Sequence, residues 1–411
     1  MPELQRSPLA PPEFPDMPDV RGVRLATAEA KIRYHGRDDL LLVELDSGTA
    51  VAGVFTQSTT AAAPVCWSRS VTERGYARAL LVNSGNANAF TGDQGMRDVE
   101  ASAVAAADAI GCRPAELLIA STGVIGEPLP VERITTALHG LKSRLKTGSW
   151  QAAAQAISTT DTYPKGSACE TQLGDTPVTI AGVAKGSGMI APDMATMLAF
   201  VFTDAAIPPQ ILQSLLTTGV STSFNCITVD SDTSTSDTLL LAATGQAGNR
   251  APHSIRDREL RTFRRALNAV LTDLAIQVVR DGEGASKFIT IEVGGASSPA
   301  AARTAGLAVA NSPLVKTAIA GEDANWGRVI MAVGKSGVRL DPSKLSVAMG
   351  GVVIAENGGR VDRYDESLLT DHLHGTEILI EVDLGVGKSK GRVWTCDLTH
   401  DYIRINADYR T

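Results

Sequence analysis

The sequence has few of the residues that mark several protein classes. Only 4% of its 411 residues are aromatic, and its 38 lysines and arginines are outnumbered by 45 aspartates and glutamates, for a formal net charge of −7. Nucleic-acid binding needs clustered basic residues, often with aromatic side chains on which bases stack, so this balance argues against a nucleic-acid partner. The hydrophobic fraction of 44% is ordinary for globular proteins and argues against a disordered chain.

Cysteines and long apolar runs are equally scarce. The five cysteines are scattered without a C-x-x-C pair, which is typical of neither a disulfide framework nor a zinc site. No window reaches the roughly 18 apolar residues of a membrane helix, and the proline-rich start lacks the apolar run of a signal peptide. We therefore expect a cytoplasmic protein with no membrane segment.

Metal and nucleotide sites are not indicated either. His372 and His374 lie two residues apart, which on a strand would put both rings on one side, but no third ligand of suitable spacing lies nearby. Two Gly-Lys-Ser tripeptides begin at Gly334 and Gly387. A phosphate loop needs another glycine five residues earlier, but these positions are Val329 and Val382. We expect no metal site and no phosphate loop.

Helical and strand patterns alternate along the chain. Residues 39–56 are typical of two strands in a hairpin around a Ser-Gly turn, and residues 175–186 and 196–204 of two more strands. Helices are predicted within residues 98–111, 208–224 and 254–284. Residues 287–295, 376–385 and 391–408 are predicted as strands. The mixture predicts an α/β or α+β fold with layered sheets and helices.

One stretch combines a loop with a possible nucleophile. Residues 183–204 read VAKGSGMIAPDMATMLAFVFTD, so glycines and a proline precede a predicted strand that opens with Thr196. A threonine hydroxyl needs a base, and its own α-amine can serve once the preceding peptide bond is cut. On the pattern alone, a threonine that merely opens a core strand is the commoner interpretation.

The same stretch resembles a known family. KGSGMIAPDMATMLAF is similar to the signature of the ornithine acetyltransferase (glutamate N-acetyltransferase) family of arginine biosynthesis. Further blocks resemble those of the family, in order and over nearly the whole chain: VNSGNANAFTG, ASTGVIG, STTDTYPK, VDSDTSTSDT, DGEGASK, GEDANWGR and INADYRT.

The resemblance implies a self-cleaving enzyme with an architecture like that of N-terminal-nucleophile proteins. The cut would fall between Ala195 and Thr196, giving an α chain of residues 1–195 and a β chain of residues 196–411 that assemble as an α2β2 heterotetramer. Thr196 would then carry the acetyl group as the nucleophile. Thr122 and Gly123 would form the oxyanion hole, which stabilises negative charge on the attacked carbonyl oxygen.

The implied reaction moves an acetyl group from N2-acetylornithine to glutamate by double displacement, with no cofactor. Some relatives also use acetyl-CoA, and the motifs do not separate the two kinds. Besides Thr196, the resemblance implies these substrate-binding residues: Thr159, Lys185, Glu283, Asn406 and Thr411. One lysine and one glutamate suit the carboxylate and the ammonium of an amino acid.

Two other functions stay open at this point. A self-processing amidohydrolase or aminopeptidase would pass the acyl group to water instead of glutamate. An unprocessed binding protein that senses intermediates of arginine biosynthesis would stay uncut, although the presence of Thr196, Thr122 and Gly123 argues against it. The acyl acceptor and the length of the purified chain discriminate these alternatives.

Overall fold

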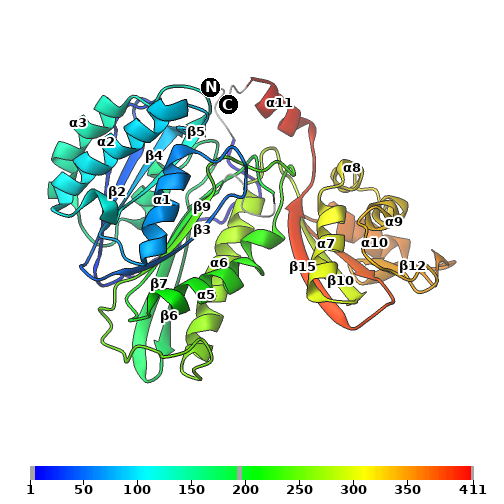
Figure 1. Ribbon diagram of the computed structural model, residues 1–411. Helices are drawn as coiled ribbons and strands as arrows, with labels where there is room; N and C mark the ends of the chain where they lie inside the picture. Colours follow the sequence, from blue (N-terminus) through cyan, green and yellow to red (C-terminus); the bar gives the residue numbers. More distant parts are fainter. Residues whose placement is uncertain (1–4, 192–196, 409–411) are drawn as a thin grey trace. The chain divides into compact units, whose positions relative to one another are not determined.

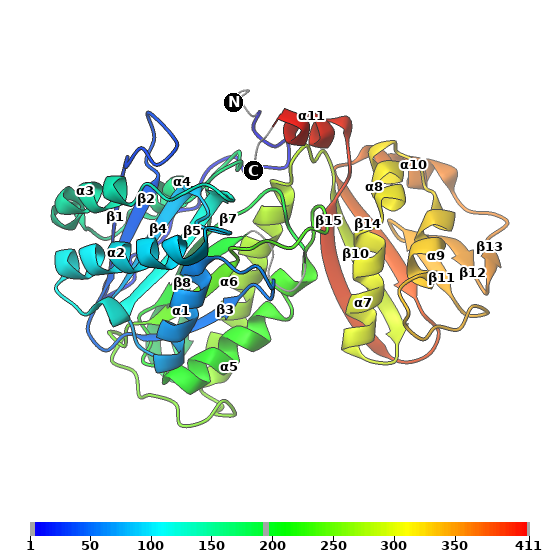
Figure 2. The ribbon, with the colours of Figure 1, turned by 45° about the horizontal axis from the view of Figure 1, so that its top comes forward.

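The computed structural model describes residues 5–191 and 197–408, which fall into two compact units (Figures 1 and 2). The N-terminal unit comprises residues 11–191, 197–225 and 232–278. The C-terminal unit comprises residues 5–10, 226–231 and 279–408. Both units combine strands and helices, so the predicted mixed α/β class with layered sheets is confirmed.

The N-terminal unit contains two sheets. A four-stranded sheet has the order β1-β2-β4-β5, and a five-stranded sheet has the order β3-β9-β8-β7-β6. Their strands are β1 (Val23–Ala28), β2 (Leu40–Leu45), β3 (Ala50–Phe55), β4 (Ala79–Asn86), β5 (Leu117–Val124), β6 (Lys165–Leu173), β7 (Thr176–Lys185), β8 (Leu198–Thr203) and β9 (Thr238–Ala243).

The helices of this unit are α1 (Ala63–Arg74), α2 (Gly92–Ile110), α3 (Val131–Leu141), α4 (Trp150–Ala156), α5 (Pro209–Val220) and α6 (Leu260–Arg280). Helices α2 and α3 cover the outer face of the four-stranded sheet, and α5 and α6 cover that of the five-stranded sheet (Figure 1). Val65 of α1 and Ala153 of α4 instead join the core between the sheets. Val99 of α2 and Ile134 of α3 join a core with Leu42 and Leu81 of the four-stranded sheet. On the five-stranded sheet, Gly182 of β7 leaves room for Leu274 of α6. The unit is therefore layered helix, sheet, sheet, helix.

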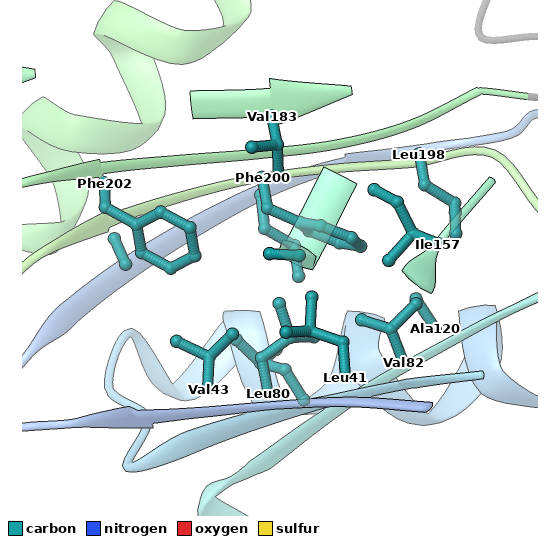
Figure 3. Packing of buried hydrophobic residues seen from close by; sticks show 14 of the residues in the cluster. Leu41, Val43, Leu80, Val82, Ala120, Ile157, Val183, Leu198, Phe200 and Phe202 are labelled. Carbon is teal, nitrogen blue, oxygen red and sulfur yellow. The ribbon is translucent and has the colours of Figure 1, made fainter. Parts of the chain in front are cut away.

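The two sheets pack face to face through an apolar core (Figure 3). Leu41 and Val43 of β2 point into this core, whereas their neighbours Leu40 and Leu42 join the core on the helix side. Because successive side chains of a strand point to opposite faces, a strand covered on both faces is apolar at every position. Leu198 and Phe200 of the five-stranded sheet complete the core from the other side.

The predicted hairpin of residues 39–56 is wrong. Both strands form, as β2 and β3, but β2 pairs with β1 and β4, whereas β3 pairs with β9. The Ser-Gly turn between them leads the chain from one sheet to the other. An apolar run predicts that a strand is buried, but it does not identify the strand's partner, and here each strand finds a partner in its own layer.

The C-terminal unit contains one sheet of six strands, in the order β13-β12-β11-β14-β10-β15. The strands are β10 (Phe288–Ala296), β11 (Ser346–Met349), β12 (Val352–Glu356), β13 (Gly359–Arg360), β14 (Glu377–Asp383) and β15 (Ser389–Cys396). The helices are α7 (Pro299–Ala310), α8 (Pro313–Ala320), α9 (Trp326–Gly334), α10 (Glu366–His374) and α11 (His400–Asp408). Ile291 and Ile380 of the sheet pack with Val309 of α7 and Val333 of α9 in a core of their own.

One strand prediction in this unit needs correction. The strand predicted for residues 391–408 ends at Cys396, and residues 400–408 form helix α11. The Thr399 hydroxyl accepts a hydrogen bond from the Asp401 amide at the helix start, which outweighs the apparent alternation of apolar residues. His372 and His374 lie on helix α10, and the Leu379 amide donates to His372 Nε2.

Two features are absent from the part of the chain that the structure describes. Residues 5–191 and 197–408 contain no cluster of three or more histidine, cysteine or acidic side chains arranged to hold a metal ion. None of the helices formed by these residues has the length and apolar character needed to cross a membrane.

Candidate active site

Lys185 brings three of the predicted site residues together within the N-terminal unit. It is the last residue of β7, and its side chain is only 2% exposed. Its Nζ donates to the Thr159 hydroxyl at 2.8 Å and to the Thr122 hydroxyl at 3.4 Å. Thr122 belongs to the four-stranded sheet and Lys185 to the five-stranded sheet, so the ammonium group joins the ends of two strands from different layers.

A buried carboxylate that the sequence analysis did not single out organises this cluster. Asp161 Oδ1 accepts hydrogen bonds from Lys165 Nζ and from the Gly186 amide, each at 2.6 Å. Its Oδ2 accepts from the Thr159 amide at 3.0 Å and lies 4.0 Å from Lys185 Nζ. The Asp161 side chain is 1% exposed and that of Lys165 is fully buried. Asp161 thus binds the ammonium of Lys165, lies close to that of Lys185, and fixes the backbone at Thr159 and Gly186.

Opposing effects act on the pKa of Asp161. Burial alone would raise it, because a carboxylate loses its hydration in the protein interior. The charges of Lys165 and Lys185, together with the hydrogen bonds from Lys165 and Gly186, outweigh burial and hold the pKa below its ordinary value. Asp161 is therefore ionised across the physiological pH range.

Replacing Asp161 by asparagine is expected to destabilise the protein at neutral pH. The amide keeps the shape but leaves two buried lysines without this counter-charge, and breaking a buried ion pair typically costs about 3–5 kcal/mol. A carboxylate with a depressed pKa stabilises the fold above its unfolded pKa of about 3.9, and this contribution is lost as the pH falls through the folded pKa. The difference between wild type and variant, measured by urea unfolding, should therefore shrink below about pH 4.

Asp204→Asn is the matched control for this comparison. Asp204 is also buried and accepts from a backbone amide, that of Thr179, but its ion-pair partner Arg21 is 56% exposed. Because solvent screens that pair, its loss should cost about 1 kcal/mol or less. Equal destabilisation by the two substitutions would contradict the special role of the Asp161 cluster.

The carboxyl ends of β4 and β5 are joined by a buried polar network. The Ser121 hydroxyl donates to Asn83 Oδ1 at 2.5 Å, and Asn83 Nδ2 donates to the Asn86 carbonyl at 2.9 Å. β4 and β5 pair in parallel until the register shifts at Gly85 and Asn86, opposite Gly123. Gly123 has φ 132°, and a Cβ there would lie 2.3 Å from the carbonyl carbon of Gly85. Only glycine fits this close approach of two backbones.

The contacts of Thr122 leave its hydroxyl hydrogen available. Its oxygen accepts from Lys185, and a hydroxyl that accepts from an ammonium can still donate its own hydrogen. A positive charge beside it strengthens that donation. Next to it in the chain, Gly123 lacks a side chain that would shield its backbone. The arrangement suits stabilisation of a developing negative charge.

Glu283 and Asn406 lie together in the C-terminal unit. Asn406 on α11 donates from Nδ2 to Glu283 Oε2 at 2.8 Å. The loop that carries Glu283 is pressed against the start of α11, because a Cβ at Gly284 would lie 2.4 Å from the Tyr402 amide nitrogen. The Thr399 hydroxyl also donates to the Gly284 carbonyl at 2.7 Å. Glu283 is half-buried in this loop, with one carboxylate oxygen fixed by Asn406.

Three predicted site residues, Ala195, Thr196 and Thr411, lie outside the described residues. Met197 follows Thr196 in the sequence, and both its backbone amide and its backbone carbonyl are hydrogen-bonded. Its amide donates to Asp237 Oδ1 at 3.0 Å, and its carbonyl accepts from the Thr238 amide at 3.2 Å. The start of β8 is thus fixed to the start of β9.

Comparison with known proteins extends over the whole chain. The model of the ArgJ family matches residues 24–411. A relative from Gluconobacter oxydans (strain 621H), named "Arginine biosynthesis bifunctional protein ArgJ", is 54% identical over 421 residues, covering 100% of this chain and 99% of the relative. A relative of the same name from Bradyrhizobium diazoefficiens is 55% identical over 408 residues, covering 98% and 99%.

Solved structures of similar proteins were also found. A crystal structure of the protein of the same name from Bacillus halodurans is 40% identical, covers 50% of this chain and 96% of that one, and superposes with a TM-score of 0.48. The family model and the full-length relatives, which confirm the resemblance seen in the sequence, show that the chain belongs to the ArgJ family.

Proposed function

We propose that this protein transfers an acetyl group from N2-acetylornithine to glutamate in arginine biosynthesis, after cutting itself between Ala195 and Thr196. The observation that carries the proposal is the buried contact of Lys185 with Thr122 and Thr159, three residues that the sequence blocks placed in one site. Full-length relatives named as arginine biosynthesis proteins support the pathway.

The proposed chemistry is a double displacement at Thr196. The α-amine freed by cleavage takes the proton from Thr196 Oγ, which attacks the acetyl carbonyl and forms an ester as ornithine leaves. The Thr122 hydroxyl and the Gly123 amide stabilise the negative oxygen. The amine of glutamate then attacks the ester and leaves as N-acetylglutamate. No step uses a metal or an organic cofactor.

The remaining residues would bind the amino-acid groups of the substrates. The Lys185 ammonium suits a carboxylate, and Thr159, which accepts from it, fixes its position. Glu283 suits the substrate ammonium, with Asn406 orienting its carboxylate. Thr411 would add a further contact from the end of the chain.

The pairing of strands would keep the two pieces together after the cut. β7 precedes the proposed cleavage point and β8 follows it, and these strands pair from Ile180 opposite Thr203 to Lys185 opposite Leu198. β3 likewise pairs with β9 across the cut. An α chain of residues 1–195 and a β chain of residues 196–411 would therefore share one sheet and one core.

The word "bifunctional" in the names of the relatives supports a second activity. We include acetyl-CoA-dependent synthesis of N-acetylglutamate in the proposal, through the same acetyl ester. We further propose that the processed protein is cytoplasmic and assembles as an α2β2 heterotetramer.

The test supplies purified protein with N-acetylornithine and glutamate and follows both acyl acceptors. N-acetylglutamate is expected to form faster than free acetate, because the ester is passed to an amine. Mass spectrometry after brief exposure to N-acetylornithine should show two chains, with one acetyl group added to the β chain. Replacing N-acetylornithine by acetyl-CoA tests the second activity.

Two outcomes would contradict the proposal. Acetate that accumulates in place of N-acetylglutamate would favour the amidohydrolase or aminopeptidase alternative. A single full-length band on a denaturing gel of fresh protein would favour the unprocessed binding protein. Asp204→Asn protein, altered far along β8 from the proposed cut, serves as a control and should behave like wild type in both assays.

A further inference from the structure

Asp237 is a buried acid that the proposed transfer reaction does not use. It directly precedes β9, is 0% exposed, and its carbonyl accepts from the Thr56 amide at 3.0 Å. Its Oδ1 accepts from the Met197 amide at 3.0 Å, while the Thr238 amide next to it binds the Met197 carbonyl. The Asp237 carboxyl is therefore fixed to the backbone of the residue that follows Thr196 in the sequence.

The second oxygen of this carboxyl is unusual. Within residues 5–191 and 197–408, Asp237 Oδ2 has no hydrogen-bond partner although it is buried. A buried acceptor without a donor lowers stability, and an ionised carboxylate in that state lowers it far more. The strand contacts of Met197 need only Oδ1, so they leave the buried Oδ2 unexplained.

The surroundings of Asp237 favour its protonated form. Burial raises its pKa well above the ordinary value. The hydrogen bond from the Met197 amide, the charge of Lys185 and the nearby Thr56 hydroxyl, whose own hydrogen goes to the Ser234 carbonyl, oppose this rise only in part. The neighbouring strands β3, β8 and β9 contain no ionisable residue. The charge that acts on the Asp237 carboxyl is that of Lys185, at the end of β7. A protonated Asp237 carries a hydrogen that it can donate.

Resting on the proposed self-cleavage, we propose that Asp237 donates the proton that the leaving nitrogen takes up when the bond between Ala195 and Thr196 breaks. Only an α-carbon and a carbonyl carbon separate the nitrogen of Thr196 from that of Met197, which Asp237 binds. The carboxyl is thus tied to the backbone beside the reacting bond.

The step balances in atoms and charge. Thr196 Oγ attacks the Ala195 carbonyl carbon, the C–N bond breaks, and an ester forms between Ala195 and Thr196. The nitrogen gains the proton of Asp237, and the proton released from Oγ restores the acid. Water then hydrolyses the ester, which frees the Ala195 carboxyl and the Thr196 hydroxyl. Asp237 returns to its starting state and no other reactant is consumed.

Asp237→Asn separates proton donation from the structural role. The amide keeps an oxygen that accepts from Met197 but is not an acid. Because general acid catalysis typically contributes 10²- to 10⁴-fold, we expect cleavage of freshly translated full-length chain to slow about 100-fold or more. The conversion is followed by pulse-labelling in cell-free translation and denaturing gels. Hydroxylamine, which cleaves esters, should release far fewer fragments from the variant than from wild type, because the ester forms only slowly.

The pH dependence of wild-type cleavage gives a readout that does not rely on a variant. As the pH rises through the pKa of Asp237, the acid loses its proton, so cleavage should slow on the alkaline side. The residual cleavage of Asp237→Asn should not show this decline. A wild-type rate that shows no decline on the alkaline side, at any pH at which the protein stays folded, would overturn the proposal.

Asp204→Asn is again the matched control, since it is a buried acid at the other end of β8 that accepts from a backbone amide. It should cleave at the wild-type rate. Cleavage of Asp237→Asn at the wild-type rate would disprove the role of Asp237 and leave the proposed function intact. A wild-type chain that stays uncut in this assay would instead disprove the proposed function itself.

Discussion

Replacing Thr196 by alanine is expected to abolish both self-cleavage and acetyl transfer. One hydroxyl group attacks the Ala195 carbonyl in the first reaction and the acetyl carbonyl in the second, so neither has a nucleophile without it. Loss of a nucleophilic hydroxyl in other enzymes reduces turnover by about 10⁴-fold or more. A denaturing gel should show a single band of full length, and N-acetylglutamate should not form from N-acetylornithine and glutamate.

Two further threonine variants sharpen the result. Thr196→Ser keeps a hydroxyl group and should still be cut. Thr203→Ala changes the buried threonine at the end of β8, whose hydroxyl accepts from the Ala205 amide, and should be processed normally. A Thr196→Ala protein found as two chains would refute the proposed chemistry, since another group would then have broken the bond.

The local parts of the fold could be predicted from the sequence. The strand at residues 175–186 forms as β7, and the helix within residues 208–224 forms as α5, with prolines at its start. Both follow from periodicity and from residues with a fixed effect on the backbone. The pairing of β3 with β9 could not be predicted in this way, because it joins strands far apart in the chain.

The tail shows a different limit. The alternation in residues 400–408 suggested a strand, yet the segment forms α11. Tyr402 and Ile405 are three residues apart, a spacing that a helix also places on one face. A short run fits both periods, and contacts elsewhere in the fold decide between them. The carboxylate of Asp397, which accepts from the amides of Ser286 and Lys287, fixes the chain just after β15.

The candidate site was predicted only in part. Thr122, Thr159 and Lys185 came from resemblance to a family, because each looks ordinary in an unaligned sequence. Asp161 was missed although it stands two residues after Thr159, since nothing in the sequence shows that it is buried between two lysines. The role of Asp237 was missed as well, since its place in a polar run of the sequence does not show that its carboxyl is buried against the Met197 amide. The pKa of a carboxyl depends on its burial and on the charges near it in space, and neither can be seen in the sequence.

Replacing Gly123 by alanine is expected to damage stability and activity together. The new Cβ would lie 2.3 Å from the Gly85 carbonyl carbon and 2.5 Å from the Asn86 nitrogen, both of them backbone atoms that cannot rotate away. The φ of 132° adds strain for any residue with a Cβ. The end of β5 must therefore move away from β4, and we expect a loss of about 3 kcal/mol or more in the free energy of unfolding.

The same movement would displace the proposed oxyanion hole. The Gly123 amide and the Thr122 hydroxyl both lie on the segment that must shift, and losing one such donor typically lowers turnover by about 10²- to 10³-fold. Measured at a temperature where the variant remains folded, kcat for acetyl transfer should fall by this much, while the KM for N-acetylornithine changes less. The KM should change less because Lys185 is held independently by Asp161 and Thr159.

Gly126→Ala, in the loop just after β5, separates the effect of backbone strain from that of the close contact between backbones. Gly126 also has a positive φ, 82°, but a Cβ there would meet no atom within 4 Å. It should therefore cost only the backbone strain, about 1 kcal/mol, and leave kcat nearly unchanged. If the two alanine variants were equally stable and equally active, the contact between Gly123 and the Gly85–Asn86 backbone would not be what positions the donors. The assignment of Thr122 and Gly123 as the oxyanion hole would then lose its structural support.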